Sequence, residues 1–339
     1  MKRLFFFIIV LLGIFFLFEH KDAAVNLAGK VVGTISSEQK SNEEYNPIEQ
    51  TKDIKVFFCP KDDCAKQVLQ LLEEAKNSIH CSVYELNIAE IYNLLEQKQK
   101  KIDVKVVVDN TNPIKSSFVH MDTSNGLMHN KFCIVDGTAF FTGSFNPTIN
   151  DNEKNNNNLL IIHSKGLAKN YETEFSEQWN GIFGRGEKNV ITDFSLNGTR
   201  VENYFCPEDS CTNHILENLA SAKSTIHFMA FSFTSNAIGD ELVKKYSEGV
   251  EVKGVMEKKQ QNAFDEFAKL AHANIPVLWD INKYNMHHKV FIIDSEVVIT
   301  GSFNPTKNAE MNNDENVLII HDKEIARQYE EEFVRVYPK

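Results

Sequence analysis

Hydrophobic and polar positions follow the same order twice along this chain. Each copy opens with apolar residues at helical spacing, continues through two strand-like apolar runs, and closes with another strand and a helix. Alternating helices and strands predict an α/β fold with two pseudo-symmetric halves, each a mixed, mostly parallel β-sheet flanked by helices. The matching segments are 68–75 and 215–222, 79–84 and 226–233, 104–108 and 250–255, and 159–162 and 317–320.

The two copies are offset by 147 residues at first and by 158 residues after an insertion in the second copy. The insertion includes a helical stretch near 263–272. Two such units in one chain can pack around a pseudo-twofold axis, as the subunits of a dimer do. We therefore expect one half over 54–185 and another over 200–339, with equivalent residues meeting at their interface, so that no oligomer is required.

A different pattern precedes the repeats. Lys2 and Arg3 come before an uninterrupted apolar run over 4–18, and polar residues dominate from 19 to 50. We expect residues 1–20 to be an N-terminal membrane anchor or a secretory signal peptide, and 21–53 a polar linker. The small-x-small pattern expected of a signal-peptide cleavage site is poorly matched after the apolar run, which favours an uncleaved anchor. The expected location is a membrane-anchored protein with an exported body, or a secreted or periplasmic one if the segment is cleaved.

Composition narrows the function classes. Hydrophobic content of 42% in 339 residues excludes general disorder. A formal charge of −11 argues against a protein that coats nucleic acid through charge alone. Six cysteines are too few for a fold held mainly by disulfides, so the hydrophobic core must stabilise it.

Each copy carries the same polar motif, His-x-Lys, then Asp, then Gly-Ser-x-Asn. A strand would place the imidazole and the ammonium on one face, about 7 Å apart. The motif holds no carboxylate pair, and a protonated lysine repels cations, so we expect no metal and no cofactor. Two imidazoles, two ammoniums and two amides suit a phosphodiester. The motif residues are His129, Lys131, Asp136, Ser144 and Asn146, and His287, Lys289, Asp294, Ser302 and Asn304.

These motifs resemble the paired HKD motifs of the phospholipase D superfamily, over roughly residues 54–337. The second half is similar to compact bacterial endonucleases and mitochondrial cardiolipin hydrolases. The resemblance implies metal-independent phosphodiester hydrolysis through a phosphohistidine, in one site shared by both halves. The catalytic set it implies is His129, Lys131, His287, Lys289 and Glu315, with Asp136 and Asp294 supporting it structurally. The phosphate-binding set is Lys131, Ser144, Asn146, Lys289, Ser302 and Asn304.

The two motifs differ at one position. The second is followed by Glu315-Asn316, as in the family, whereas the first is followed by Asn157-Asn158. If each residue reaches across to the opposite histidine, Glu315 would orient His129 and stabilise its cationic phosphorylated form. We therefore expect His129 to be the nucleophile and His287 the general acid and base.

The cysteines allow two interpretations. Cys59 with Cys64, and Cys206 with Cys211, could form local disulfides or a four-cysteine zinc site, and export favours disulfides. Cys81 and Cys133 lie in apolar strands, where we expect buried thiols.

The sequence thus predicts a phosphodiesterase of phospholipase D type that hydrolyses a phospholipid headgroup ester and contacts the membrane through its N-terminal apolar segment. The alternative is an exported or membrane-tethered endonuclease that cleaves DNA or RNA by the same chemistry. A non-catalytic phosphate-binding module is disfavoured because both motifs are intact.

Overall fold

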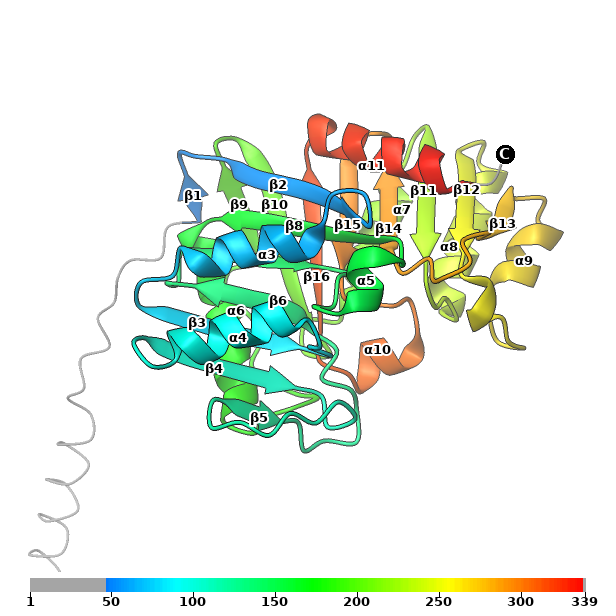
Figure 1. The fold of residues 1–339 in the computed structure, drawn as a ribbon. Helices are drawn as coiled ribbons and strands as arrows, with labels where there is room; N and C mark the ends of the chain where they lie inside the picture. The colour runs from blue at the N-terminus through cyan, green and yellow to red at the C-terminus, as the bar shows by residue number, and fades with distance from the viewer. Residues whose placement is uncertain (1–46, 338–339) are drawn as a thin grey trace, which may run out of the picture. The chain divides into compact units, whose positions relative to one another are not determined.

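Two mixed β-sheets, one from each repeat, form the framework of the chain (Figure 1). The computed structural model describes residues 47–337. Within these residues, a seven-stranded sheet has the order β2-β8-β7-β6-β3-β4-β5, and a nine-stranded sheet has the order β1-β9-β10-β16-β15-β14-β11-β12-β13. Each repeat therefore builds its own sheet, and the equivalent strands take equivalent places in the two sheets.

The first sheet and its helices run in the order β2 (Asp53–Cys59), α3 (Cys64–Glu73), β3 (Ser78–Val83), α4 (Ala89–Lys98), β4 (Asp103–Val108), β5 (Val119–Met121), β6 (Lys131–Val135), β7 (Ala139–Gly143), α5 (Ile149–Glu153), β8 (Asn157–His163) and α6 (Lys165–Trp179).

The second sheet uses β1 (Ile48–Glu49) and then β9 (Asp193–Leu196), β10 (Thr199–Cys206), α7 (Cys211–Ser221), β11 (Thr225–Ala230), α8 (Asn236–Ser247), β12 (Glu251–Met256), the 3-10 turn η1 (Lys258–Gln260), α9 (Phe267–His272), β13 (Val277–Trp279), β14 (Lys289–Ile293), β15 (Val297–Gly301), α10 (Lys307–Met311), β16 (Glu315–His321) and α11 (Lys323–Val336).

Strand pairing corrects one expectation. The sheets are mixed, but antiparallel pairs outnumber parallel ones among the described strands. Parallel pairing joins β3 to β4 and β4 to β5 in the first sheet, and β11 to β12, β12 to β13 and β1 to β9 in the second. Helix α4 connects the parallel strands β3 and β4, and α8 connects β11 and β12 in the same way. Short turns join β6 to β7 and β14 to β15, so those pairs are antiparallel.

Two strands lie outside the expected halves. Ile48 and Glu49 fall in the segment expected as linker, yet they form β1, which pairs with Ser195 and Leu196 of β9. Strand β9 itself precedes the expected start of the second half and pairs with β10. The apolar side chains of Phe194 and Leu196 are buried, which explains why this part of the chain joins the sheet.

The helical stripe read from the sequence faces the core in both halves. Val68 and Leu72 of α3, and Ile215 and Leu219 of α7, are at most 1% exposed. They pack on strands such as β3 and β11 within one hydrophobic cluster per half. The period of 3.6 residues therefore predicted the buried face correctly.

The two halves exchange contacts through their closing helices. Tyr171 of α6 packs edge-on against Phe205 of β10, with ring centroids 5.0 Å apart. Its equivalent, Tyr329 of α11, packs against Phe58 of β2 at 5.1 Å. Asn158 of the first half donates to the Tyr329 hydroxyl at 3.0 Å. These reciprocal contacts are those of a pseudo-twofold interface.

All six cysteines form disulfides. Cys59 pairs with Cys64 and Cys206 with Cys211, as expected. Cys81 and Cys133 also pair, so the expectation of buried thiols was wrong. The register of β3 and β6 places these two residues directly opposite each other, with Cα atoms 4.0 Å apart. Spacing along the chain does not reveal such a pair, because strand register decides it.

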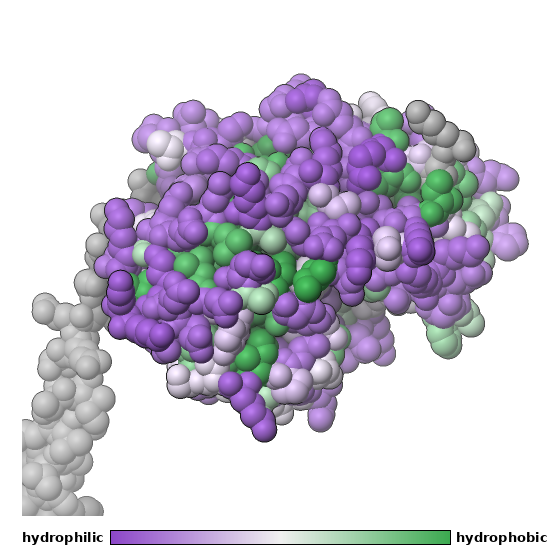
Figure 2. All heavy atoms as spheres, viewed as in Figure 1, coloured by the Kyte–Doolittle hydropathy of each residue, from purple (hydrophilic) through white to green (hydrophobic). Residues whose placement is uncertain are grey.

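The expected N-terminal anchor or signal, residues 1–20, lies outside the described residues. Among residues 47–337, no helix combines the length and apolar character needed to cross a membrane. The face of the body in Figure 2 is mainly hydrophilic, with a hydrophobic area on the first half.

Candidate active site

His129 and His287 line the same pocket at the junction of the two halves. Each stands two residues before its strand, β6 or β14, and its backbone is held by the opposite half. The His129 amide donates to the Asp314 carbonyl at 3.0 Å, and the His287 amide donates to the Asn156 carbonyl at 2.8 Å. Interface contacts therefore bring together two residues that lie far apart in the sequence.

The imidazole rings are also oriented from across the interface. Nδ1 of His129 lies 2.8 Å from Oε2 of Glu315, and Nδ1 of His287 lies 2.8 Å from Oδ1 of Asn157. Both partners are acceptors, so each neutral ring carries its proton on Nδ1 and keeps Nε2 for a ligand in the pocket. The rings pack edge-on against Tyr84 and Phe231.

The electrostatic surroundings of the two histidines differ. Burial lowers the pKa of His129, while the Glu315 carboxylate acts in the opposite direction. The pKa of His287 is lowered well below its ordinary value by burial and then by the Lys289 and Lys131 ammoniums. Both pKa values are lowered, and the difference between the histidines lies in Glu315, whose carboxylate opposes the effect of burial on His129.

Lys131 and Lys289 contact the motif histidines but are not among the residues that line the pocket. Both side chains are buried, and each Nζ donates to the carbonyl oxygen of the motif histidine, at 2.6 Å and 2.8 Å. Burial lowers the pKa of Lys131 to about 8, and burial and Lys131 together lower the pKa of Lys289 strongly. An ammonium has three donors, so each retains hydrogens beyond that one bond.

The motif asparagines reach the pocket, but the motif serines do not. Asn146 and Asn304 line it. Ser144 Oγ instead donates to Asn157 at 3.1 Å, and Ser302 Oγ donates to Glu315 Oε2 at 2.6 Å. In place of the predicted contact with phosphate, both serines hold the residues that orient the histidines.

The motif aspartates lie away from the pocket. Asp136 accepts hydrogen bonds from the backbone amides of 76–78, and Asp294 does the same for 223–225. Each therefore ties the turn after β6 or β14 to the chain segment that leads into β3 or β11. The structure supports the expected structural role of these residues and places neither of them beside the reacting groups.

Sequence reasoning missed Asp151 on α5. Its Oδ2 accepts from the backbone and the side chain of Asn146, at 2.8 Å and 2.9 Å, and lies 3.6 Å from Nδ1 of His287. The equivalent residue in the second half is Ala309. The first half thus lacks a carboxylate at Asn157 but has one a few residues earlier. A comparison of the two repeats at this position could have found it.

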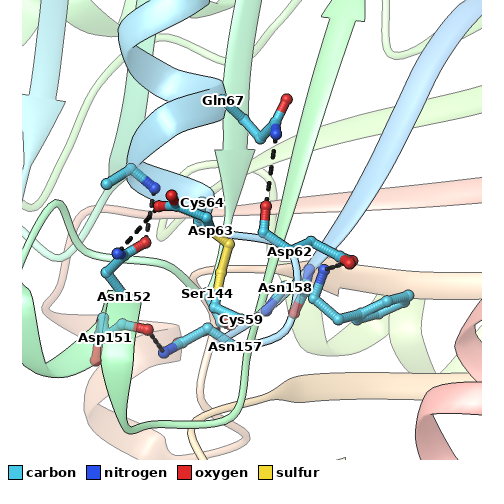
Figure 3. Close-up of a disulfide and its surroundings, with 12 residues drawn as sticks. Cys59, Asp62, Asp63, Cys64, Gln67, Ser144, Asp151, Asn152, Asn157 and Asn158 are labelled. Atoms are coloured by element: carbon cyan, nitrogen blue, oxygen red, sulfur yellow. Dashed lines mark hydrogen bonds between the residues drawn. A yellow bond between two sulfur atoms is a disulfide. The ribbon is translucent and has the colours of Figure 1, made fainter.

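Each local disulfide lies beside a residue that orients a histidine. Cys59 pairs across β2 and β8 with Asn157, and Cys206 pairs across β10 and β16 with Glu315. Figure 3 shows the Cys59–Cys64 disulfide next to Asn157, whose side-chain amide donates to the Asp151 carbonyl at 3.3 Å. Each disulfide therefore ties the end of β2 or β10 to the helix that follows it, beside the neighbouring strand that carries the acceptor for Nδ1.

Comparisons with known proteins show which family this chain resembles. A family model described as "Cardiolipin synthase, PLD-like domain" matches residues 68–179 and 215–337. Phospholipase D of Rickettsia bellii (strain RML369-C) is 34% identical over 135 residues, 40% of this chain and 67% of that protein. Mitochondrial cardiolipin hydrolase of Mus musculus is 35% identical over 130 residues, 38% of this chain and 59% of that protein. The matched part is therefore about three fifths to two thirds of the length of these relatives.

The crystal structure of phosphatidylserine synthase from Haemophilus influenzae Rd KW20 is similar in fold. It matches 84% of this chain and 86% of its own, with a TM-score of 0.64 and 13% sequence identity. This likeness extends over both halves, as does the match to the family model. The chain belongs to the phospholipase D-like family of phosphodiesterases.

Proposed function

We propose that this protein hydrolyses the headgroup phosphodiester of a phospholipid, without a metal ion, through a phosphohistidine on His129. One observation carries the proposal: two histidines from separate repeats line one pocket, and each is oriented through Nδ1 by the opposite half. That arrangement leaves two Nε2 atoms for one phosphate group, which is what a two-step displacement requires.

In the first step, His129 Nε2 attacks phosphorus and the bond to the leaving oxygen breaks. His287 supplies the proton to that oxygen, because the bound phosphodiester anion raises the pKa of its ring. Glu315 stabilises the positive charge that develops on the phosphorylated His129 ring. In the second step, His287 removes a proton from water, which attacks phosphorus and restores His129. Lys131 and Lys289 neutralise the non-bridging oxygens throughout.

The pocket rim favours a lipid over a polyanion. Phe264 lines the pocket and is 81% exposed. Ile149 of α5 and Met311 of α10 are exposed beside pocket-lining residues of the same helices. Acidic side chains such as Glu85 and Asp265 also line the pocket, and they would repel the many phosphates of a nucleic acid. Three disulfides support an exported body.

A parallel assay tests the substrate. The full chain is offered a phospholipid in vesicles, a single-stranded DNA and bis(p-nitrophenyl) phosphate, each with and without EDTA. We expect release of the lipid headgroup and of p-nitrophenolate, both retained in EDTA. Cleavage of DNA with no release of headgroup would favour the endonuclease alternative, and activity restored only by a divalent ion would contradict the mechanism.

A trapping experiment tests the roles of the histidines. A p-nitrophenolate leaving group scarcely needs an acid, so His129 of the His287→Ala variant should still attack the substrate, but the variant should fail to activate water. The phosphoryl group, which still carries the second p-nitrophenyl ester of the substrate, should then accumulate on His129, where intact-mass analysis and peptide mapping would find it. Label on His287 in the mirror variant His129→Ala, with none in His287→Ala, would reverse the assignment.

A further inference from the structure

Four carboxylates gather around α6, outside the pocket lining. Glu174 and Glu177 lie on α6, and Glu208 comes from the turn before α7 in the other half. Carboxylate oxygens of these three residues lie within 4.8 Å of one another. The fourth residue, Asp314, immediately precedes β16. The cluster therefore joins the closing helix of the first half to two segments of the second half.

Asp314 provides a second and independent observation. Its side chain is 2% exposed, and Oδ1 accepts from the Gly184 amide at 2.7 Å. Oδ2 is buried and has no hydrogen-bond partner among the described residues. Its charge raises the pKa of Glu174, and its equivalent in the other half, Asn156, contacts Arg335, the equivalent of Glu177. A buried carboxylate oxygen without a donor calls for a cation or a proton.

The internal repeat shows what occupies the equivalent place in the other half. There Glu332 stands for Glu174, Arg335 for Glu177 and Asn156 for Asp314. The Arg335 guanidinium donates to Glu332 Oε1 at 2.6 Å and to Asn156 Oδ1 at 2.9 Å.

Two further cationic or basic groups belong to that second arrangement. Lys61, the equivalent of Glu208, lines the same small pocket as Glu332 and Arg335. His288, the equivalent of Asn130, lies 2.9 Å from Glu332. The arginine, lysine and histidine of one half are thus replaced by two carboxylates and an amide in the other.

Nothing on the protein side compensates this charge within the described residues. No lysine, arginine or histidine there forms an ion pair with any of the four carboxylates. Their donors are neutral: the side-chain amides of Asn130 and Gln178 reach Glu174 at 3.1 Å and 2.6 Å, and the backbone amides of Glu187 and Gly184 reach Glu177 and Asp314 at 3.1 Å and 2.7 Å. Burial and neighbouring carboxylates raise the pKa of all four carboxyls, that of Glu208 to about 7.

We propose that Glu174, Glu177, Glu208 and Asp314 bind a Ca²⁺ ion that joins the two halves where Arg335 joins them on the other side. Carboxylate oxygens are the ligands that Ca²⁺ prefers, at about 2.3–2.6 Å, so opposite ligands lie up to about 5 Å apart. Ligand oxygens of Glu174, Glu177 and Glu208 lie within 4.8 Å of one another, which is close enough for all three to reach one such ion. Mg²⁺ usually keeps several of its waters and is seldom held by protein carboxylates alone, so the proposal is for Ca²⁺.

The site is structural in this proposal, because none of its four residues lines the pocket. Asp314 precedes Glu315, so the ion would steady the strand that orients His129. Removing it should lower the melting temperature, while activity at room temperature persists. This inference is therefore independent of the proposed reaction, and either one can fail without the other.

The test is thermal unfolding of the full chain, stripped with EDTA and then titrated with CaCl2 or MgCl2. At about 5 mM CaCl2 we expect the melting temperature to rise by about 5 °C, and calorimetry should show one site per chain. Glu208→Gln should weaken the response, whereas Glu96→Gln, which removes an exposed carboxylate on α4, should retain it in full.

Glu177→Arg is the decisive variant, because it restores the residue found in the other half. The new guanidinium can bridge Glu174 and Asp314 as Arg335 bridges Glu332 and Asn156. We expect no response to Ca²⁺ and a melting temperature in EDTA at least equal to that of the stripped wild type. Absence of a Ca²⁺ response in the wild type, an undiminished response in this variant, or an equal response to Mg²⁺ would overturn the proposal.

Discussion

Replacing Glu315 by glutamine tests whether the carboxylate beneath His129 drives the reaction. Glu315 is fully buried, and its Oε2 lies 2.8 Å from His129 Nδ1 and 2.6 Å from Ser302 Oγ. Its Oε1 accepts from the side-chain amide of Asn313 at 3.2 Å. A carboxylate accepts on both sides, whereas a glutamine has one accepting oxygen and one donating amino group. The substitution therefore removes a charge and also creates a mismatch.

Both orientations of the new amide carry a cost. With its NH2 group toward Asn313, two donors meet, and Asn313 cannot simply rotate because its oxygen accepts from the Leu127 amide at 3.2 Å. With the NH2 group toward His129, Nδ1 must lose its proton and the ring adopts the wrong tautomer.

The size of the effect follows from these contacts. A hydrogen bond to a charged group contributes about 1.5–3 kcal/mol, and a neutral one about 0.5–1.5 kcal/mol. The lost charge also no longer stabilises the cationic phosphorylated ring. We expect a loss of about 2–3 kcal/mol of transition-state stabilisation, which at about 1.4 kcal/mol per tenfold lowers kcat/KM by about 30- to 150-fold.

The assay is release of p-nitrophenolate from bis(p-nitrophenyl) phosphate, with the melting temperature measured on the same samples. Glu332→Gln is the matched control, because Glu332 is also buried and lies 2.9 Å from His288, a histidine outside the pocket lining. This control should lose stability but keep kcat/KM within about twofold per folded molecule. A folded Glu315→Gln enzyme within about threefold of wild type would refute the reasoning.

Three further predictions also concern the rate of phosphodiester hydrolysis. Lys131→Ala and Lys289→Ala should each lower kcat by about 10²- to 10³-fold, because both ammoniums serve one phosphate, whereas two independent sites would leave about half the activity in each variant. The pH profile of kcat/KM should fall as the pH rises through about 8, where Lys131 loses the charge that binds phosphate. A flat profile above pH 7 would contradict the role of Lys131. On the acid side, kcat/KM should begin to fall only below the ordinary histidine pKa of 6.5, because burial lowers the pKa of His129. Asp151→Asn removes the carboxylate 3.6 Å from His287, so its defect should be about tenfold larger for an alkyl than for an aryl leaving group, and equal defects would argue against acid catalysis by His287.

Much of this molecule could be predicted because it is duplicated. The repeat of His129, Lys131 and Asn146 as His287, Lys289 and Asn304 indicated a shared site. The difference between Asn157 and Glu315 indicated that the two histidines are unequal. Local periodicity also predicted the buried faces of α3 and α7, because a helical stripe depends only on nearby residues.

Other features depend on contacts between distant segments. The Cys81–Cys133 disulfide follows from the register of β3 and β6, which spacing along the chain does not encode. The predominance of antiparallel pairing follows from how turns and crossovers place the strands.

The roles of several polar residues were also decided only in three dimensions. Ser144 and Ser302 lie in the motif, but the fold turns their hydroxyls away from the pocket and toward Asn157 and Glu315. Asp151 lies outside the repeated motif, yet α5 brings it beside His287. The sequence by itself thus determined which chemical groups the protein carries and that they occur in pairs. The tertiary structure decided which of them meet, because hydrogen bonds and charges act over a few ångströms in space and not along the chain.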